Sequence, residues 1–338
     1  MWAFALLILV SGASMAYQLY AMVYAPRVFI GEKESEYLYI PSSSTFEDVI
    51  KLLYQRKLIT HKKSFEYLAS WKNYNRVFSG KYLIRKGMSH NDLVNLLRSG
   101  EQEPIKVVIN NIRTIEELSG KVAKQIEADS VSILMLLQDG RYLNKINSHK
   151  ESVLAMFIPN TYQFYWDTSA KEFIERMQGE HNRFWNSKRI AKAKDVGLTK
   201  VEVTVLASII QKETTKNDEK SRVAGVYMNR LKKGMKLQAD PTLIYAMGDF
   251  SITRVLNKYK KVDSPYNTYK YTGLPPGPIC LSEISSIDAV LNFEDHNYFY
   301  FCAKEDFSGY HNFAKSYAQH LLNARRYQRE LNKRKILS

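Results

Sequence analysis

The N-terminus of the chain is a long run without a charged side chain. Residues 2–24 read WAFALLILVSGASMAYQLYAMVY. An uncharged helix of this length matches the thickness of a lipid bilayer. Tyr17, Tyr20 and Tyr24 stand near its end, where aromatic side chains favour the membrane interface. We therefore expect a transmembrane anchor over residues 1–25, followed by a globular body.

A cleaved signal peptide is the alternative interpretation of this run. Residues 11–16 (SGASMA) offer small side chains to a peptidase, but no basic residue precedes the apolar stretch, as it would in a signal peptide. The retained anchor is favoured for that reason. Its orientation is ambiguous, because Arg27 and Lys33 follow the run and no Lys or Arg precedes it. The positive-inside rule alone would place the body in the cytoplasm.

The body of the chain is basic. The formal net charge is +15 over 338 residues, a balance that attracts nucleic acid, anionic lipid or acidic polymers. No zinc-ligand spacing, RNA-binding aromatic strand or basic-region heptad accompanies it, so we expect no nucleic-acid partner. Cys280 and Cys302 are too few for a disulfide framework or a zinc site. They could pair in an extracytoplasmic domain, but two buried free thiols are the simpler expectation.

A short internal repeat follows the anchor. Residues 44–53 (STFEDVIKLL) and 88–97 (MSHNDLVNLL) align without a gap. Each begins with a Ser/Thr-x-x-Asp pattern that caps a helix N-terminus. A strand-like run precedes each helix, at 37–40 and at 80–84. The pattern predicts a small α+β subdomain over 26–104, with chance similarity between two amphipathic helices as the alternative.

A glutamate stands on the apolar stripe of another predicted helix. Leu206, Ile209 and Ile210 recur at helical spacing, and Glu213 lies seven, four and three residues after them. The sequence TKVE at 199–202 is a capping box that specifies where this helix begins. Glu213 is therefore expected on the buried face, near the C-terminal end of the helix.

A carboxyl group in apolar surroundings resists ionisation. Its pKa rises, so it holds a proton near neutrality, as the general acid of glycosidic cleavage must. A structural ion pair is the competing interpretation, with Lys212 or Arg222 as the partner. The sequence contains no phosphate-binding loop, dinucleotide fingerprint, zinc-protease motif or nucleophile elbow, so we expect no cofactor and no metal.

Glu213 has few rivals among the carboxylates of this region. Glu202 belongs to the capping box, and Asp218 and Glu219 stand at the start of a second helix, where acids are favoured in any case. Asp240 could cap or orient a turn. Glycosidases normally use two carboxylates in fixed geometry, and no compelling second one is found. That absence favours a reaction whose nucleophile belongs to the substrate.

Segments rich in aromatic and amide side chains follow this helix pair. Residues 237–248 and 264–279 contain Asn, Gln, Thr and Tyr, which can hydrogen-bond sugar hydroxyls and acetamido groups. The second segment is expected to be a long loop stiffened by prolines. Residues 298–303 predict a strand and 309–314 a turn. The basic tail, 319–338, predicts a helix with a solvated face.

Four separated strings together resemble one enzyme family. They are LASIIQKET at 206–214, VYMNRLKKGMKLQADPTLIYAMG at 226–248, YNTYKYTGLPPGPI at 266–279 and GYHNFA at 309–314. In this order and spacing they resemble the YceG-like (MltG) endolytic murein transglycosylases, over about residues 155–320. Residues 26–104 resemble the LysM-like subdomain of that family more weakly. PNTYQF at 159–164 carries Asn160 where the family usually has Asp.

The resemblance implies an α+β fold with three parts. These are the transmembrane helix, the LysM-like subdomain and a YceG-like catalytic domain over 105–338, with core motifs at 199–314. It also implies a single-pass inner-membrane protein whose catalytic domain faces the periplasm and the cell wall, against the charge rule. The expected partners are peptidoglycan glycan strands and the membrane, with peptidoglycan synthases as further candidates.

The same resemblance implies a mechanism. Glu213 matches the catalytic glutamate of the family, whereas Gln211 stands where many relatives have an acid. Glu213 is then expected to protonate the bond between N-acetylmuramic acid (MurNAc) and N-acetylglucosamine (GlcNAc). It would next take the proton of the MurNAc C6 hydroxyl, which gives a 1,6-anhydro end and terminates strand elongation. The residues expected along the glycan groove are Asn229, Gln238, Asp240, Tyr266, Asn267, Thr268, Tyr269, His311 and Asn312.

Two other functions fit parts of the pattern. A hydrolytic muramidase on the same scaffold would need a positioned water and a second carboxylate, for which Asp240 is the candidate. A membrane-anchored peptidoglycan-binding module would use residues 36–100 and keep Glu213 only for structure. For His311, a purely structural role is as strong an alternative as a place in the site.

Overall fold

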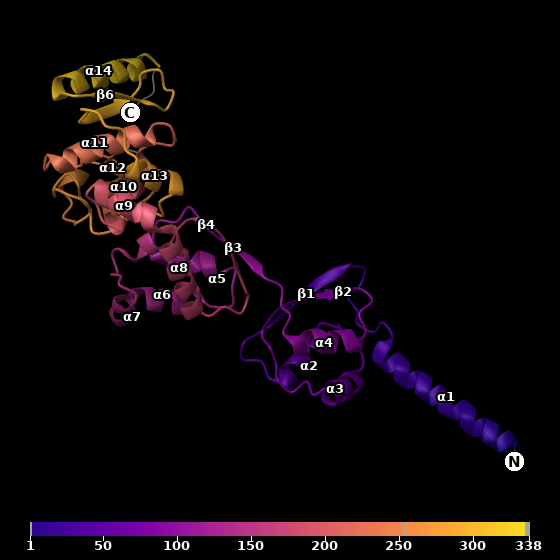
Figure 1. Ribbon diagram of the computed structural model, residues 1–338. Helices are drawn as coiled ribbons and strands as arrows, with labels where there is room; N and C mark the ends of the chain where they lie inside the picture. Colours follow the sequence, from indigo (N-terminus) through magenta and orange to yellow (C-terminus); the bar gives the residue numbers. More distant parts are fainter. Residues whose placement is uncertain (1, 253–254, 335–338) are drawn as a thin grey trace. The chain divides into compact units, whose positions relative to one another are not determined.

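The computed structural model describes residues 2–252 and 255–334. Contacts within the chain divide it into two units. The N-terminal unit comprises Met1–Val107, Lys124–Ala128 and Gln163–Ser169, and the C-terminal unit comprises Val108–Ala123, Asp129–Tyr162 and Ala170–Ser338. Both units contain helices and strands (Figure 1). The predicted mixed helix-and-sheet class is therefore confirmed.

The chain begins with helix α1 (Trp2–Tyr24). Among the described residues this is the one helix long and apolar enough to cross a membrane, over Phe4–Tyr24, and none of its apolar window is buried in the protein. The prediction of an apolar N-terminal helix is confirmed. Its length and composition suit a membrane span and equally a signal sequence.

A two-stranded sheet and three helices build the rest of the N-terminal unit. Strands β1 (Ser35–Ile40) and β2 (Gly80–Arg85) pair antiparallel, with Leu38 opposite Tyr82. The helices are α2 (Phe46–Gln55), α3 (Lys62–Trp71) and α4 (His90–Ser99). Leu38 and Tyr82 are fully buried in one hydrophobic cluster with side chains from all three helices.

The internal repeat corresponds to α2 and α4. The side chains of Thr45 and Ser89 accept the backbone N–H groups of Asp48 and Asp92, and both aspartates bond back to the capping residues. The predicted helices and their N-caps are thus confirmed. Helix α3 is not predicted from the sequence, because its N-cap, His61, makes no side-chain capping bond and leaves no start signal.

The boundary between the units passes through strands β3 (Ile105–Ile109) and β4 (Asn160–Phe164). The C-terminal unit contains the remaining elements. They are α5 (Ile115–Ala123), α6 (Ser130–Gln138), α7 (Gly140–Lys145), η1 (Val153–Met156), α8 (Ala170–Phe184), α9 (Ser187–Asp195), α10 (Lys200–Glu213), α11 (Lys220–Lys232), α12 (Asp240–Met247), η2 (Tyr259–Lys261), α13 (Ile284–Leu291), β5 (Tyr300–Ala303), β6 (His311–Ala314) and α14 (Tyr317–Lys333).

Helix α10 forms the centre of the C-terminal unit. Residues 203–210 are all buried, and α9, α11, α12 and α13 pack against the helix (Figure 1). The predicted capping box is present: Thr199 Oγ1 accepts the Glu202 N–H at 3.2 Å, and Glu202 Oε2 accepts the Thr199 N–H at 2.8 Å. The start and the end of this helix therefore agree with the sequence prediction.

The proline-rich segment 264–279 contains no helix or strand, as predicted for a long loop. Its end is fixed on α10, because the Ile279 N–H donates to Ser208 Oγ at 3.0 Å. Gly277 allows a second close approach, since a Cβ atom there would lie 1.7 Å from the Glu151 carbonyl oxygen. The loop is thus held in place beside the end of α10.

Candidate active site

Glu213 is the last residue of α10 and lines a cavity of about 260 Å³. Leu206, Ile209 and Ile210 are buried on the same helix, which ends at Glu213. Walls of the cavity come from α10, α11, α12, α14, strand β5 and the loops around them. The lining residues are Glu213, Tyr227, Arg230, Gln238, Asp240, Tyr269, Tyr300, Phe301, Tyr317 and His320.

Tyr227 holds the Glu213 carboxyl group. Its hydroxyl, on α11, donates to Glu213 Oε1 at 2.7 Å. Burial raises the pKa of Glu213 to about 7, and the negative charge of Asp240 adds to the rise. The hydrogen bond from Tyr227 and the positive charge of Arg230 lower the pKa and offset only part of the effect of burial. Glu213 can therefore give up and regain a proton near neutral pH.

The structural ion pair considered for Glu213 is not formed. Arg222 pairs instead with Glu294, with 2.9 Å between Nε and Oε2. Lys212, the neighbour of Glu213, lines a different cavity. The interpretation of Lys212 or Arg222 as the partner is wrong. Lys212 points to another side of α10 than its neighbour Glu213, and Arg222 on α11 is engaged by Glu294.

Asp240 is the second carboxylate of the cavity. It is exposed at the start of α12, and the Tyr269 hydroxyl donates to its Oδ1 at 2.5 Å. Gln238, two residues earlier, has a φ of 51°, a conformation that costs free energy in a non-glycine residue and recurs at functional sites. Its N–H donates to the Thr268 carbonyl at 3.0 Å. Three predicted groove residues, Gln238, Asp240 and Tyr269, thus line the cavity of Glu213.

Asn267 and Thr268 lie behind this lining and hold the loop. Both residues are buried. The Asn267 amide donates to two backbone carbonyls at 3.0 and 2.7 Å, and its oxygen accepts the Tyr269 N–H at 2.9 Å. Thr268 Oγ1 accepts the Ala239 N–H at 3.0 Å. Their polar atoms are engaged within the protein, so the structure places these residues in the support of the cavity.

Asn229 and Tyr266 are not among the lining residues. The Asn229 amide donates to the carbonyls of His296 and Tyr298, at 2.6 and 3.0 Å. The Tyr266 ring lies 4.7 Å from the Tyr245 ring, centroid to centroid, and lines a separate cavity next to α5. The two side chains thus connect α11 and the 264–279 loop to neighbouring segments.

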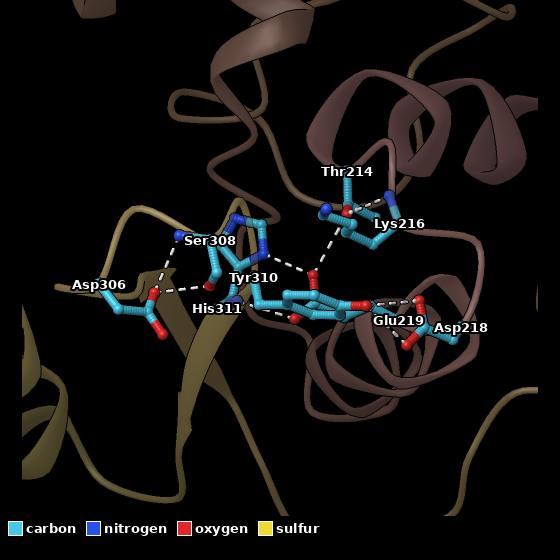
Figure 2. A network of polar contacts seen from close by, with 8 residues as sticks. All are labelled: Thr214, Lys216, Asp218, Glu219, Asp306, Ser308, Tyr310 and His311. Carbon is cyan, nitrogen blue, oxygen red and sulfur yellow. Dashed lines mark hydrogen bonds and ion pairs between the residues drawn. The ribbon is translucent and has the colours of Figure 1, made fainter.

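His311 and Asn312 are the first residues of strand β6. Figure 2 shows His311 in a polar network around Glu219, which accepts the His311 N–H on Oε1 at 2.8 Å and contacts Nδ1 through Oε2 at 2.7 Å. Thr214 Oγ1 donates to the same Oε2 at 3.2 Å. Asn312 donates to Glu305 Oε2 at 2.7 Å. The network joins the turn after α10 to the strand pair β5–β6.

Comparison with known proteins places this chain in a family. The profile of the YceG-like family matches residues 38–326. The chain belongs to the YceG-like family. A relative named endolytic murein transglycosylase, from Bacillus subtilis (strain 168), is 30% identical over 284 residues, which cover 79% of this chain and 78% of that protein.

Two further relatives extend this comparison. An endolytic murein transglycosylase from Streptococcus pneumoniae serotype 2 is 26% identical over 296 residues and covers 78% of this chain. The match spans 53% of that longer relative. The crystal structure of a YceG-like protein from Listeria monocytogenes has a TM-score of 0.58 at 30% identity, and the match covers 86% of this chain and 99% of that one.

The cavity of this YceG-like protein also contains residues that the sequence analysis missed. Tyr300 and Phe301 come from β5, and Tyr317 and His320 from the first turns of α14. Burial lowers the pKa of His320, and the charge of Arg230 adds to the decrease. Most of residues 319–334 are exposed, as predicted for a solvated helix, and His320 in addition lines the cavity. The signal was a Tyr and a His three residues apart, which share one face of a helix.

Arg230 is the buried cation of the cavity. It donates from Nε to the Phe299 carbonyl at 2.7 Å and from Nη1 to the Leu237 carbonyl at 2.5 Å. Only 7% of the residue is exposed. Within the part of the chain that the structure describes, no ion pair joins this guanidinium to a carboxylate. Arg230 therefore supplies a fixed positive potential beside Glu213.

The two cysteines lie in the C-terminal unit. Cys280 is buried and Cys302 half-buried, and both are free within the described residues. The expectation of free thiols is confirmed, whereas complete burial holds only for Cys280.

Residues 2–252 and 255–334 contain no group of three or more His, Cys, Asp or Glu that could hold a metal ion.

Proposed function

We propose that this YceG-like protein is an endolytic peptidoglycan transglycosylase, a lyase that cleaves glycan strands internally. The observation that carries the proposal is the Glu213 carboxyl group, held in a polar and aromatic cavity with a pKa of about 7. The names of the relatives support the substrate class. The hydroxyl, amide and ring groups of the lining suit sugar hydroxyls and acetamido groups. The proposed reaction needs no cofactor.

Protonated Glu213 starts the proposed reaction. It donates its proton to the oxygen between MurNAc C1 and GlcNAc, the C1–O bond breaks, and the bonding electrons stay on that oxygen. The MurNAc ring becomes oxocarbenium-like, and the acetamido oxygen of the substrate itself offsets the charge at C1. Tyr227 donates its hydrogen bond to the carboxylate that forms on Glu213.

The same residue completes the reaction as a base. Glu213 takes the proton of the MurNAc C6 hydroxyl, and the C6 oxygen bonds to C1. The product is a 1,6-anhydro end, no water is consumed, and Glu213 is protonated again. We propose that Gln238, Asp240 and Tyr269 contact the glycan. The other groove candidates would act through the segments they hold: Asn229, Tyr266, Asn267, Thr268, His311 and Asn312.

Hydrolysis is the second candidate function, because Asp240 lines the same cavity as Glu213. A muramidase would use this carboxylate to position a water for attack on C1. Asp240 accepts a hydrogen bond from Tyr269, and its charge raises the pKa of Glu213. A raised pKa of Glu213 serves the one-carboxylate mechanism as well. The products of the reaction therefore distinguish the two mechanisms.

We further propose that α1 anchors the protein in the inner membrane, with the body of the chain after residue 25 on the cell-wall side. The exposed apolar helix supports this placement. Residues 26–104 would form a LysM-like subdomain that binds glycan, and residues 105–338 the catalytic domain. Cleavage beside the membrane would end the elongation of nascent strands, which makes peptidoglycan synthases the proposed partners.

The ends of the digested strands test the proposal. Full-length protein in detergent is incubated with purified glycan strands, and the fragments are analysed by mass spectrometry. We expect 1,6-anhydro ends. Reducing ends, heavier by one water, would identify a hydrolase and make Asp240 the second acid. No cleavage, on strands that a muramidase digests, would leave a glycan-binding module as the better interpretation.

The pKa of Glu213 predicts how the reaction depends on pH. Because Glu213 must start protonated, kcat/KM should fall as the pH rises through about 7. In Tyr227→Phe the carboxylate loses a hydrogen bond that favours its charged form, so its pKa rises further. The alkaline limb of the pH profile should move upward by about one unit, and the maximal rate should fall about tenfold as the carboxyl group loses its orientation.

Tyr67→Phe is the matched control for this measurement. Tyr67 is 69% exposed and lies in the N-terminal unit. Its variant should reproduce the wild-type pH profile. A limb that stays in place in Tyr227→Phe, or that moves to lower pH, would contradict the assigned role of the hydrogen bond.

A further inference from the structure

A second cavity of about 150 Å³ adjoins the first in the C-terminal unit. It shares chain segments with the cavity of Glu213, because consecutive residues line the two. Lys212 lines the second cavity and Glu213 the first, and Pro241 lines the second and Asp240 the first. Consecutive Cα atoms are about 3.8 Å apart, so the two cavities lie on two sides of the same short backbone segments.

Two cations line the second cavity. They are Arg113 and Lys212, and the remaining walls are mainly apolar, from Pro241, Ile244, Tyr245 and Phe250. No Asp or Glu is part of the lining, and no ion pair joins Arg113 or Lys212 to a carboxylate within the described residues. Both cations lower the pKa of the buried Cys280 thiol, against burial, which raises it to about 11. Both side chains therefore lie near enough to Cys280 for their charges to act on the same thiol.

The guanidinium of Arg113 is held with its donors available. Its Cζ lies 4.5 Å from the centroid of the Phe250 ring, a cation–π contact that uses none of the hydrogen-bond donors. The N–H donors lie in the plane of the guanidinium and can still form a bidentate pair with a carboxylate. The nearby Glu117 carboxylate accepts the backbone N–H of Arg113, at 2.6 Å, and makes no ion pair with the guanidinium.

Half-buried cations among apolar walls suit an anionic group attached to an apolar one. The sugars of peptidoglycan carry hydroxyls and acetamides. Where a peptide stem is attached, the lactyl carboxyl group of MurNAc is in amide linkage, and the free carboxylates belong to the stem. We propose that the cavity of Arg113 and Lys212 binds a carboxylate of that stem while Glu213 acts on the same muramic residue. This inference rests on the proposed transglycosylase function and assigns it a preference for strands that carry peptides.

The test compares two substrates with full-length protein in detergent. One is a peptide-bearing glycan strand, and the other is the same strand after an amidase has removed the stems and the lactyl carboxylates that this exposes have been converted to amides. The wild type should cleave the peptide-bearing strand with a KM about tenfold lower. Arg113→Gln should lose this difference through KM, with Arg113→Lys recovering part of it. Arg141→Gln is the matched control, because Arg141 is exposed on α7 and lies in neither cavity.

A third substrate identifies the anion. Stems whose carboxylates are converted to amides keep the peptide and lose the charge, so wild type and Arg113→Gln should cleave them with the same KM. If the difference between the two proteins survives amidation, the ligand is not a carboxylate and the inference is overturned. Equal losses on all substrates would show that Arg113 only supports the fold. Failure of the wild type to cleave any strand would instead reject the proposed function.

Discussion

Glu213→Gln should abolish the release of 1,6-anhydro ends from glycan strands. Glutamine keeps the size and shape of the side chain and can still meet Tyr227, but it has no proton of suitable acidity to donate. It also cannot take the proton of the C6 hydroxyl. Because the proposed mechanism uses this residue twice, we expect kcat/KM to fall by at least about a thousandfold. Quantitative mass spectrometry of the digested strands measures the loss.

Two further variants define what this result means. Glu175→Gln makes the same change on the exposed face of α8, where Glu175 pairs with Lys171, and should leave cleavage unchanged. Asp240→Asn separates the two mechanisms. A transglycosylase should keep its anhydro products with the alkaline limb moved to lower pH, because the charge that raises the pKa of Glu213 is gone. A hydrolase would lose its activity, and an active Glu213→Gln would remove Glu213 from the mechanism.

The same Glu213→Gln variant should be more stable than the wild type at alkaline pH. The pKa of Glu213 is raised from 4.5 to about 7 in the fold, so the folded protein binds this proton more tightly than the unfolded chain. The stability from this proton is complete below the unfolded pKa and is lost as the pH rises through about 7. Part of Glu213 faces the open cavity and is screened by solvent, so we expect a gain of about 2 kcal/mol at about pH 9.

Thermal unfolding of the full-length protein at two pH values measures this gain. At about pH 4 the carboxyl group is protonated in both the folded and the unfolded wild type, and the two proteins should unfold together. A difference that is the same at both pH values would contradict the raised pKa of Glu213. The result also shows whether an inactive Glu213→Gln protein is folded.

Local sequence signals predicted the helix that ends at Glu213, but they did not predict Tyr227, the hydrogen-bond partner of the Glu213 carboxyl group. A capping box at Thr199 and the stripe of Leu206, Ile209 and Ile210 depend on neighbours within a few residues, and the structure agrees with both. Tyr227 lies on α11, and its direction depends on how α11 packs against α10. Spacing along the chain does not determine such an angle, so the residue that holds the Glu213 carboxyl group was not found.

Polar composition was a weaker guide to the glycan groove. The segment YNTY at 266–269 has the side chains that bind sugars, but Asn267 and Thr268 use them to hold the loop. The buried backbone groups of a turn need hydrogen-bond partners, and polar side chains that serve them are not available to a ligand. Tyr300 and His320, from distant parts of the chain, reach the cavity only through tertiary packing.

Glu219→Ala should destabilise the C-terminal unit. The sequence analysis explained Glu219 as an acid at the start of a helix, but α11 begins at Lys220 and Glu219 makes no capping bond. Its carboxylate is 4% exposed and accepts from the His311 N–H and from Thr214 Oγ1, and it contacts His311 Nδ1. Alanine would leave these buried groups without their acceptor, so we expect a loss of about 3 kcal/mol and of about 8 °C in Tm.

The size of this loss distinguishes a buried network from an acid that only interacts with a helix dipole. A dipole contribution would be worth about 0.3–1 kcal/mol, and the exposed control, Glu175→Ala, should cost less than about 1 kcal/mol. Glu219→Gln keeps one acceptor oxygen and should lie between alanine and the wild type. The network also ties β6 to the turn after α10. Strand β5, which pairs with β6, carries Tyr300 and Phe301 of the cavity, so Glu219→Ala should also raise the KM for glycan. A Glu219→Ala protein as stable as Glu175→Ala would show that the hairpin is held by its aromatic contacts alone, and that Glu219 has no part in shaping the cavity.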